Sequence, residues 1–274
     1  MNEWQLDPGV LAGAGVALAF FTQGWVRLRR RGRAGWDRAA LFCLGVAVAT
    51  LALVSPLHEI GEASLLSAHM LQHVALGDIA PALLVVALRG PLTFFFLPAD
   101  VLRTLARVRL LRRALSWLLR PKVSFGVWAL TLGLWHVPAA YDYALTHPLA
   151  HELEHVSFMT GGLLVWAQLV DPARRQALTR SGRLAYAGCL FAAGSALAYV
   201  LVFASSPLFP SYNPAPEPLL GLSPRGDQQL AGLVMLVEQA AALALCTAFL
   251  LRGVARPSRQ RASHATRLSG ASAR

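Results

Sequence analysis

The chain has 274 residues, of which 55% are hydrophobic and 14% are charged, against about 25% charged in ordinary soluble domains. So much apolar surface excludes disorder over most of the length and argues against a soluble globular protein. The formal net charge of +11 would suit nucleic-acid binding. The arginines, however, lie in blocks between long apolar segments, so we predict no nucleic-acid partner.

Long apolar segments follow one another along the chain, each near the roughly 20 residues that cross a bilayer. They predict an all-α, polytopic membrane bundle of seven transmembrane helices in one domain, residues 1–251. In chain order, the predicted spans are about 9–26, 39–55, 64–88, 123–145, 150–170, 184–205 and 228–251. The segment 252–274 is rich in Arg, Ser and Ala and is predicted to be a basic, disordered tail.

Basic residues occupy alternate connections. Segments 27–38, 89–122 and 171–183, together with the tail, hold every Lys and Arg except Arg225. The positive-inside rule therefore puts the N-terminus outside and the C-terminus in the cytoplasm, which agrees with an odd number of spans. The arginines are expected to fix this orientation and to touch anionic lipid. An apolar stripe at helical spacing also predicts an interfacial helix over 99–120.

With this orientation, every histidine except His264 lies on the outer side or in the outer half of the membrane. Two pairs are four residues apart, so that each pair shares one helix face: His69 with His73, and His151 with His155. His136 lies near the outer end of the fourth span. Ionisable residues inside a membrane are costly and therefore suggest function, whereas His58 and His147 lie in outer loops and are expected to have no ligand role.

Metal binding is the chemistry that this pattern favours. Met159 extends the second histidine stripe by one turn, and imidazole with thioether suits copper, while imidazole also suits zinc and haem iron. Acidic side chains could hold the imidazoles in orientation: Glu62, Asp78, Glu154, Asp227 and Glu238. Asp227 could equally cap the seventh span. Pro81 frees the carbonyl of Gly77, which predicts a kink beside Asp78.

The string His151-Glu152-Leu153-Glu154-His155 fits the H-E-x-x-H pattern of zinc metalloproteases. In those enzymes two histidines bind zinc, and Glu152 would be the general base. A third protein ligand is needed, and no downstream motif points to one. We therefore interpret the match as fortuitous and expect no enzymatic activity, with an intramembrane protease as the least favoured alternative.

Several strings resemble the CtaG-like cytochrome c oxidase assembly proteins, in the expected order from about residue 40 to 250. They are Ser67-Ala68-His69-Met70-Leu71-Gln72-His73, Leu134-Trp135-His136-Val137-Pro138, Leu153-Glu154-His155-Val156-Ser157-Phe158, Pro207-Leu208-Phe209-Pro210-Ser211-Tyr212 and Asp227-Gln228-Gln229-Leu230-Ala231-Gly232. The positions that match the family are His69, Gln72, His73, Asp78, His136, His155 and Asp227. Many members carry Trp-x-Pro-Gly after D-Q-Q-x-x-G, where this chain departs with Met235-Leu236-Val237-Glu238-Gln239.

The resemblance implies a protein of the bacterial inner membrane that helps to mature a haem–copper oxidase. Its partners would be oxidase subunits and a periplasmic copper donor. We predict that His69, His73 and His155 hold copper, with His136, His151 and Met159 as further ligands. Asp78, Asp227, Glu154 and Gln72 would support them. The alternatives are a haem-binding protein with axial histidines from the third and fifth spans, and a metal-free assembly scaffold.

Overall fold

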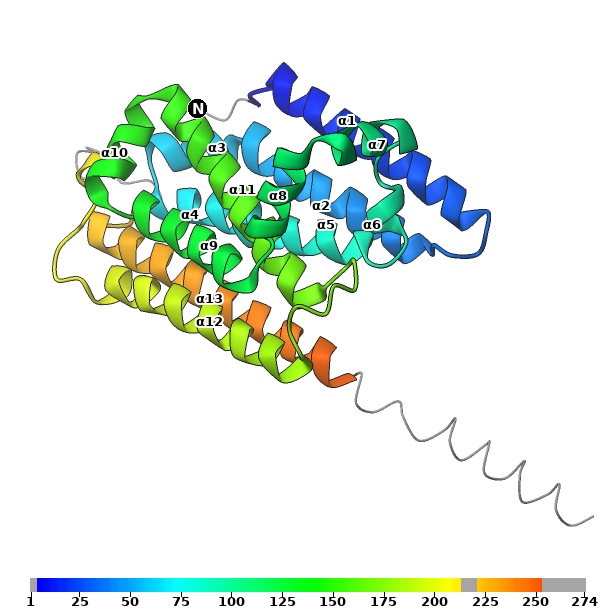
Figure 1. Ribbon diagram of the computed structural model, residues 1–274. Helices are drawn as coiled ribbons and strands as arrows, with labels where there is room; N and C mark the ends of the chain where they lie inside the picture. Colours follow the sequence, from blue (N-terminus) through cyan, green and yellow to red (C-terminus); the bar gives the residue numbers. More distant parts are fainter. Residues whose placement is uncertain (1–3, 213–220, 253–274) are drawn as a thin grey trace, which may run out of the picture.

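The computed structural model describes residues 4–212 and 221–252, and its secondary structure over these ranges is entirely helical (Figure 1). The predicted basic tail lies outside the described residues from residue 253 onward. In chain order the elements are α1 (Pro8–Arg29), α2 (Trp36–Val54), α3 (Pro56–Ala63), α4 (Leu66–Val74), η1 (Ala75–Ile79), α5 (Ala80–Leu88), α6 (Leu92–Phe95), α7 (Ala99–Arg107), α8 (Arg109–Leu118), α9 (Pro121–Trp135), α10 (Pro138–Thr146), α11 (Pro148–Val170), α12 (Arg180–Phe203), η2 (Pro210–Tyr212) and α13 (Pro224–Arg252).

Five helical segments of the described chain are long and apolar enough to cross a membrane. They are α1, α2, the continuous segment Leu66–Leu88 of α4, η1 and α5, α12, and Pro224–Leu251 of α13. These match the predicted first, second, third, sixth and seventh spans. The bent pair α9 and α10 makes a sixth if it counts as one span. Helix α11 has 23 residues but begins with a polar turn, so the count of seven and the orientation stay predictions.

The predicted fourth span, 123–145, is not one straight helix. Helices α9 and α10 meet at an angle of 78°. Pro138 explains the break, because the residue before a proline is driven out of the helical region, and Val137 is extended with ψ of 121°. The break leaves His136 at the C-cap of α9, on the inside of the bend, where it is buried.

The kink predicted beside Asp78 takes the form of one π-helical turn, η1. Pro81 has no N–H for the Gly77 carbonyl, and the chain widens to a π-helix over these residues. The Gly77 carbonyl faces Gly162 of α11, where an added Cβ would lie 2.0 Å from the oxygen. Glycine at this position therefore allows α11 to pack closely against the third predicted span.

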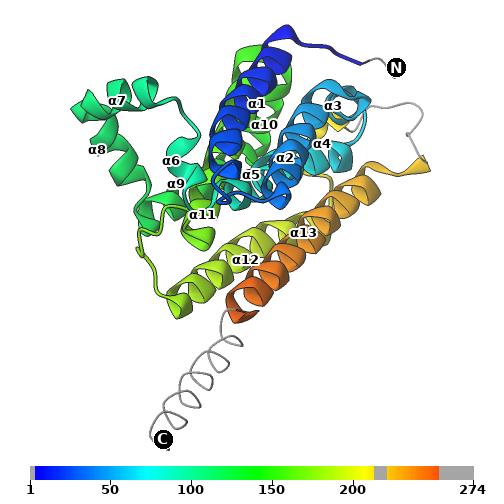
Figure 2. The same ribbon diagram turned by 90° about the vertical axis from the view of Figure 1, so that its right-hand side faces the viewer.

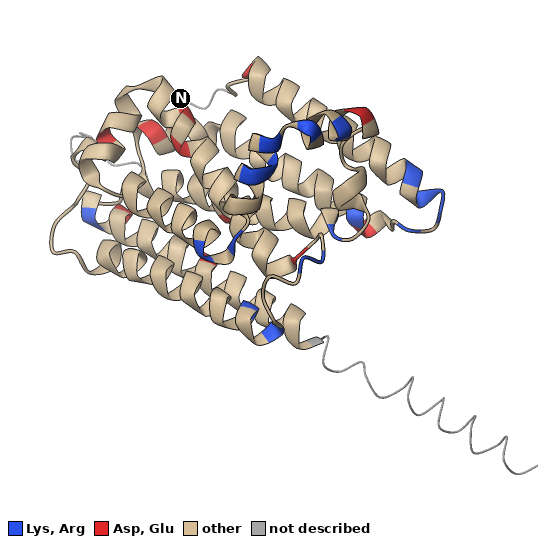
Figure 3. Ribbon diagram, in the orientation of Figure 1, with Lys and Arg blue, Asp and Glu red and all other residues tan. Residues whose placement is uncertain are grey.

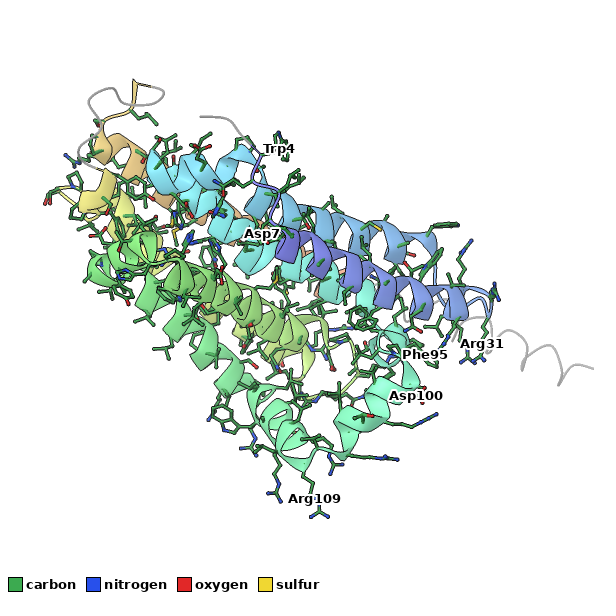
Figure 4. The ribbon with its side chains drawn as sticks, turned by 90° about the horizontal axis from the view of Figure 1, so that it is seen from above. Trp4, Asp7, Arg31, Phe95, Asp100 and Arg109 are labelled. Atoms are coloured by element: carbon green, nitrogen blue, oxygen red, sulfur yellow. The ribbon has the colours of Figure 1, made fainter. Side chains whose placement is uncertain are left out.

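The predicted interfacial helix 99–120 is divided into α7 and α8. The break lies at Val108, whose backbone is extended. Neither helix contains a buried residue, and Asp100 and Arg109 project away from the bundle (Figure 4). The apolar stripe thus has no protein partner among the described residues, as expected for helices that lie on a membrane surface.

Helices α12 and α13 form a layer of their own, which diverges from the remaining helices (Figure 2). Near α4 the two layers are joined by a buried apolar cluster that includes Leu66, Met70, Leu201 and Met235. Lys and Arg gather toward the end of the molecule remote from α3 and α10, with an exception at the start of α13 (Figure 3). The folded chain therefore keeps the charge asymmetry on which the predicted orientation rests.

Candidate metal site

Helices α3, α4 and α11 converge and bring five imidazoles together. We call these residues the histidine group: His58, His69, His73, His151 and His155. Pairs of their ring centroids are 4.3–6.4 Å apart. All are buried except His58, which is half-buried. The helical periodicity predicted that His69 pairs with His73 and His151 with His155. The fold shows in addition that these two pairs pack against each other.

Helices α4 and α11 place three imidazoles around a common point. Ligand atoms of His69, His73 and His155 all lie within 4.8 Å of one another. The Nε2 atoms of His69 and His73 are 2.9 Å apart. Nitrogen ligands about 2.0 Å from one ion would be about 3.3–3.5 Å apart in tetrahedral or trigonal geometry. The three residues therefore fit a single metal ion after small side-chain shifts.

Buried polar atoms without partners gather at the same place. His73 Nδ1, His151 Nε2, His155 Nε2 and both oxygens of Glu154 have no hydrogen-bond partner among the described residues. Glu154 Oε1 is 3.5 Å from His73 Nε2. Proteins rarely leave buried polar groups unsatisfied, because each one costs free energy. A cation held among these atoms would satisfy several of them at once, so the donor set fits a metal.

Tyr212 fixes the orientation of His69. Its hydroxyl lies 2.6 Å from the Gly61 carbonyl and 3.3 Å from His69 Nδ1. Burial raises the pKa of Tyr212 well above its ordinary value, so the hydroxyl stays protonated. A carbonyl only accepts, so the single hydroxyl proton goes to Gly61 and His69 Nδ1–H donates to the Tyr212 oxygen. His69 Nε2 then presents its lone pair to the other imidazoles.

Glu62 of α3 binds two members of the histidine group. Its Oε1 is 2.8 Å from His151 Nδ1 and 3.2 Å from His58 Nε2. Burial acts to raise the pKa of Glu62, but the hydrogen bond from His151 and the nearby His58 outweigh it and lower the pKa. The carboxylate thus holds the proton of His151 on Nδ1, which leaves His151 Nε2 free for a ligand.

His58 belongs to the site although we expected no ligand role for it. Gln72 donates to His58 Nδ1 at 2.9 Å and to the Ala52 carbonyl at 2.9 Å, so the imidazole that Gln72 contacts is not one of the predicted ligands. Burial lowers the pKa of His58, more than Glu62 raises it. The i, i+4 spacing of His58 and Glu62 was the available signal, since it puts both side chains on one helix face.

A family comparison covers nearly the whole chain. The family model described as cytochrome c oxidase caa3 assembly factor (Caa3_CtaG) matches residues 19–257. The chain belongs to this caa3 assembly factor family. No curated protein and no solved structure shows a significant match.

In this chain, Asp227 does not orient an imidazole. Its carboxylate, at the start of α13, accepts from the backbone N–H of Leu66 at 2.7 Å and of Ser67 at 3.1 Å, and from the Ser67 hydroxyl. Asp227 thus caps α4, the helix that carries His69 and His73, rather than its own helix. The position that matches the family therefore supports the histidine group through a helix end.

Three further residues that were predicted to belong to the site make contacts of other kinds. Asp78 accepts from the indole N–H of Trp166. Met159 packs against the apolar cluster of Ala52, Ala75 and Leu76. His136 lies against Met70. His147, for which no ligand role was expected, stacks on Tyr143 with ring centroids 3.8 Å apart.

The protease-like string is divided between two faces of α11. His151, Glu154 and His155 are buried, whereas Glu152 is exposed. The carboxylate that a metalloprotease would use as its base is thus on the outer face of the helix. The interpretation of the match as fortuitous and the absence of enzymatic activity stay predictions.

Proposed function

We propose that this chain is an assembly factor that binds copper as cargo for a haem–copper oxidase of the bacterial inner membrane. The ion would be held by His69, His73 and His155, with His151 and Glu154 as further donors. The observation that carries the proposal is the set of unpartnered buried atoms on His73, His151, Glu154 and His155. Imidazole nitrogen is a ligand type that copper accepts, and membership of the family supports the assembly role.

The location of the group suits exchange with partners. His58 and Glu62 are half-buried and lead from the surface to the fully buried His69. By the positive-inside rule this surface faces the periplasm. A periplasmic copper donor and an oxidase subunit could then reach the ion from the same side.

The size of the cavity that adjoins the histidine group at His73 favours a metal ion over haem. The cavity that His73 and His136 line measures about 80 Å³, whereas sites for organic ligands of cofactor size generally need several hundred Å³. Zinc remains the alternative ion, because its tetrahedral nitrogen and oxygen coordination suits the same donors.

Oxidase maturation tests this proposal in cells. We expect the His69→Ala/His155→Ala variant to lose oxidase activity, and His147→Ala to retain it, since His147 is an exposed histidine outside the group. Both variants should reach the membrane in equal amounts on immunoblots. Full maturation with the double variant would contradict the proposal and would favour a metal-free scaffold.

A further inference from the structure

The bend between α9 and α10 brings His136 against Met70 of α4. His136 Nε2 lies 3.3 Å from the Met70 sulfur, and His136 Nδ1 lies 2.8 Å from the Leu132 carbonyl. Both side chains are buried, with exposed fractions of 8% for His136 and 1% for Met70. The contact therefore joins two predicted spans at a place that water does not reach freely.

The chemistry of this contact leaves two acceptors facing each other. A carbonyl oxygen only accepts, so Nδ1 must carry the His136 proton. In a neutral imidazole the lone pair then lies on Nε2, and the thioether sulfur that it faces is also an acceptor. A doubly protonated ring would resolve the conflict but is costly in a buried apolar setting. A cation between nitrogen and sulfur resolves it directly.

The surroundings offer room and more ligands for such a cation. Met70, His73, His136 and Met235 line one cavity of about 80 Å³. Met70 and Met235 also belong to one buried cluster. The Nδ1 atom of His73 is buried without a partner among the described residues.

We propose that Met70 and His136 form a second metal site, selective for Cu(I), with His73 available to complete the coordination. Thioether sulfur is a soft ligand that favours Cu(I) over divalent ions. Bonds of about 2.0 Å to nitrogen and 2.3 Å to sulfur would put the two ligand atoms about 3.5–3.7 Å apart, close to the observed distance. The inference that the ion in this site is copper rests on the function proposed above.

His73 connects this thioether site with the histidine group. Its Nε2 faces His69, and its ring also lines the cavity with Met70 and His136. Because a neutral imidazole has one lone pair, His73 can serve one site at a time, through Nε2 or through Nδ1. A proton that moves from one ring nitrogen to the other would allow the ion to pass between the sites.

X-ray absorption of the full chain, purified in detergent and loaded with Cu(I), tests the second site. We expect a sulfur scatterer about 2.3 Å from copper in the unmodified protein. It should disappear in Met70→Leu and in His136→Gln, and persist in Met159→Leu, which makes the same substitution within an apolar cluster. Titration with Ag+, a soft ion without redox chemistry, should show one equivalent fewer in Met70→Leu than in Met159→Leu.

The His69→Ala/His155→Ala variant separates this proposal from the function proposed above. The second site predicts that the variant still binds Cu(I) with the sulfur scatterer. Sulfur scattering that is missing from the unmodified protein, or that persists in Met70→Leu, overturns the second site and leaves the histidine group untouched. If the double variant binds as much copper as the unmodified protein while Met70→Leu does not, the histidine group fails and the thioether site stands.

Discussion

Individual imidazoles in the histidine group are aimed by hydrogen bonds on the nitrogen that faces away from the centre. Tyr212 accepts from His69 Nδ1, and Glu62 accepts from His151 Nδ1. Partners of this kind fix the tautomer and the ring orientation, so their loss typically weakens metal binding about 10- to 100-fold.

Tyr212→Phe should therefore weaken Cu(I) binding by about 10-fold or more, although the substituted residue touches no ion. The hydroxyl that accepts from His69 is lost, and His69 can place its proton on Nε2 instead. Competition with a Cu(I) chelator would measure the change, with Tyr143→Phe as the control, because Tyr143 is exposed. An unchanged affinity would show that Tyr212 does not position His69.

Acid should destabilise the protein in part through His58. Burial lowers the pKa of His58 from its ordinary value of 6.5, so between the two values the unfolded chain binds more protons than the folded one. The corresponding stability is fully present above pH 6.5 and is lost as the pH falls through the lower pKa of the folded state. Thermal unfolding from pH 7 to pH 5 should depend less on pH in His58→Gln than in His147→Gln; equal slopes would contradict this role.

Residue-level predictions from the sequence succeeded where the geometry is local. The spacing of His69 and His73 is enough to pair them, because a helix fixes which residues share a face. The contact of Tyr212 with His69 joins residues 143 positions apart, and nothing in the spacing indicates it. His136 was assigned to the same group, but the bend at Pro138 turns it to Met70 instead.

At the scale of elements, the packing of α11 on η1 sets the depth at which His151 and His155 meet the other imidazoles. This packing depends on Gly162, because a side chain there would collide with the Gly77 carbonyl. Backbone atoms cannot move aside as a flexible side chain can, so the two elements would have to separate.

Gly162→Ala should therefore lower the free energy of unfolding by about 1–3 kcal/mol through overpacking. Gly126→Ala is the matched control, since a Cβ on that helical glycine meets nothing within 4 Å and alanine favours the helix by up to about 1 kcal/mol. Thermal unfolding in detergent would compare the two. Equal or higher stability of Gly162→Ala would contradict the close approach of α11 and η1.

The lengths of the apolar segments indicated the ends of the long helices to within a few residues, because these ends depend on the local sequence. The sequence indicated a disturbance at Pro81 but not its π-helical form, because a missing N–H does not by itself specify how the helix accommodates it. It missed the bend at Pro138, because the hydropathy of 123–145 continues across the break. Val108 likewise gave no sign of the division between α7 and α8.

At the scale of the whole molecule, the apolar helices describe a membrane protein whose Lys and Arg lie mostly away from α3 and α10 (Figure 3). Whether α11 crosses the membrane decides between the predicted topology and one with fewer spans. Hydropathy alone does not settle this point, because the polar residues that form the site also lower the apolarity of the helix.

Alkaline phosphatase fusions would test the predicted topology, because this enzyme needs disulfides that form only in the periplasm. We expect activity from a fusion after Thr146 and none from a fusion after Arg175, with α11 crossing between them. A green fluorescent protein fused to the C-terminus should fluoresce, as a cytoplasmic terminus requires. Activity from both phosphatase fusions would show that α11 does not span the membrane.

Metal analysis of the purified protein shows most directly whether the histidine group binds copper. We would measure copper and zinc content and Cu(I) affinity for the unmodified protein, for His69→Ala/His73→Ala and for His147→Ala. We expect tightly held Cu(I) in the unmodified protein and in His147→Ala, with a large loss in the double variant. Copper held equally by all three proteins, or by none of them, would contradict this expectation.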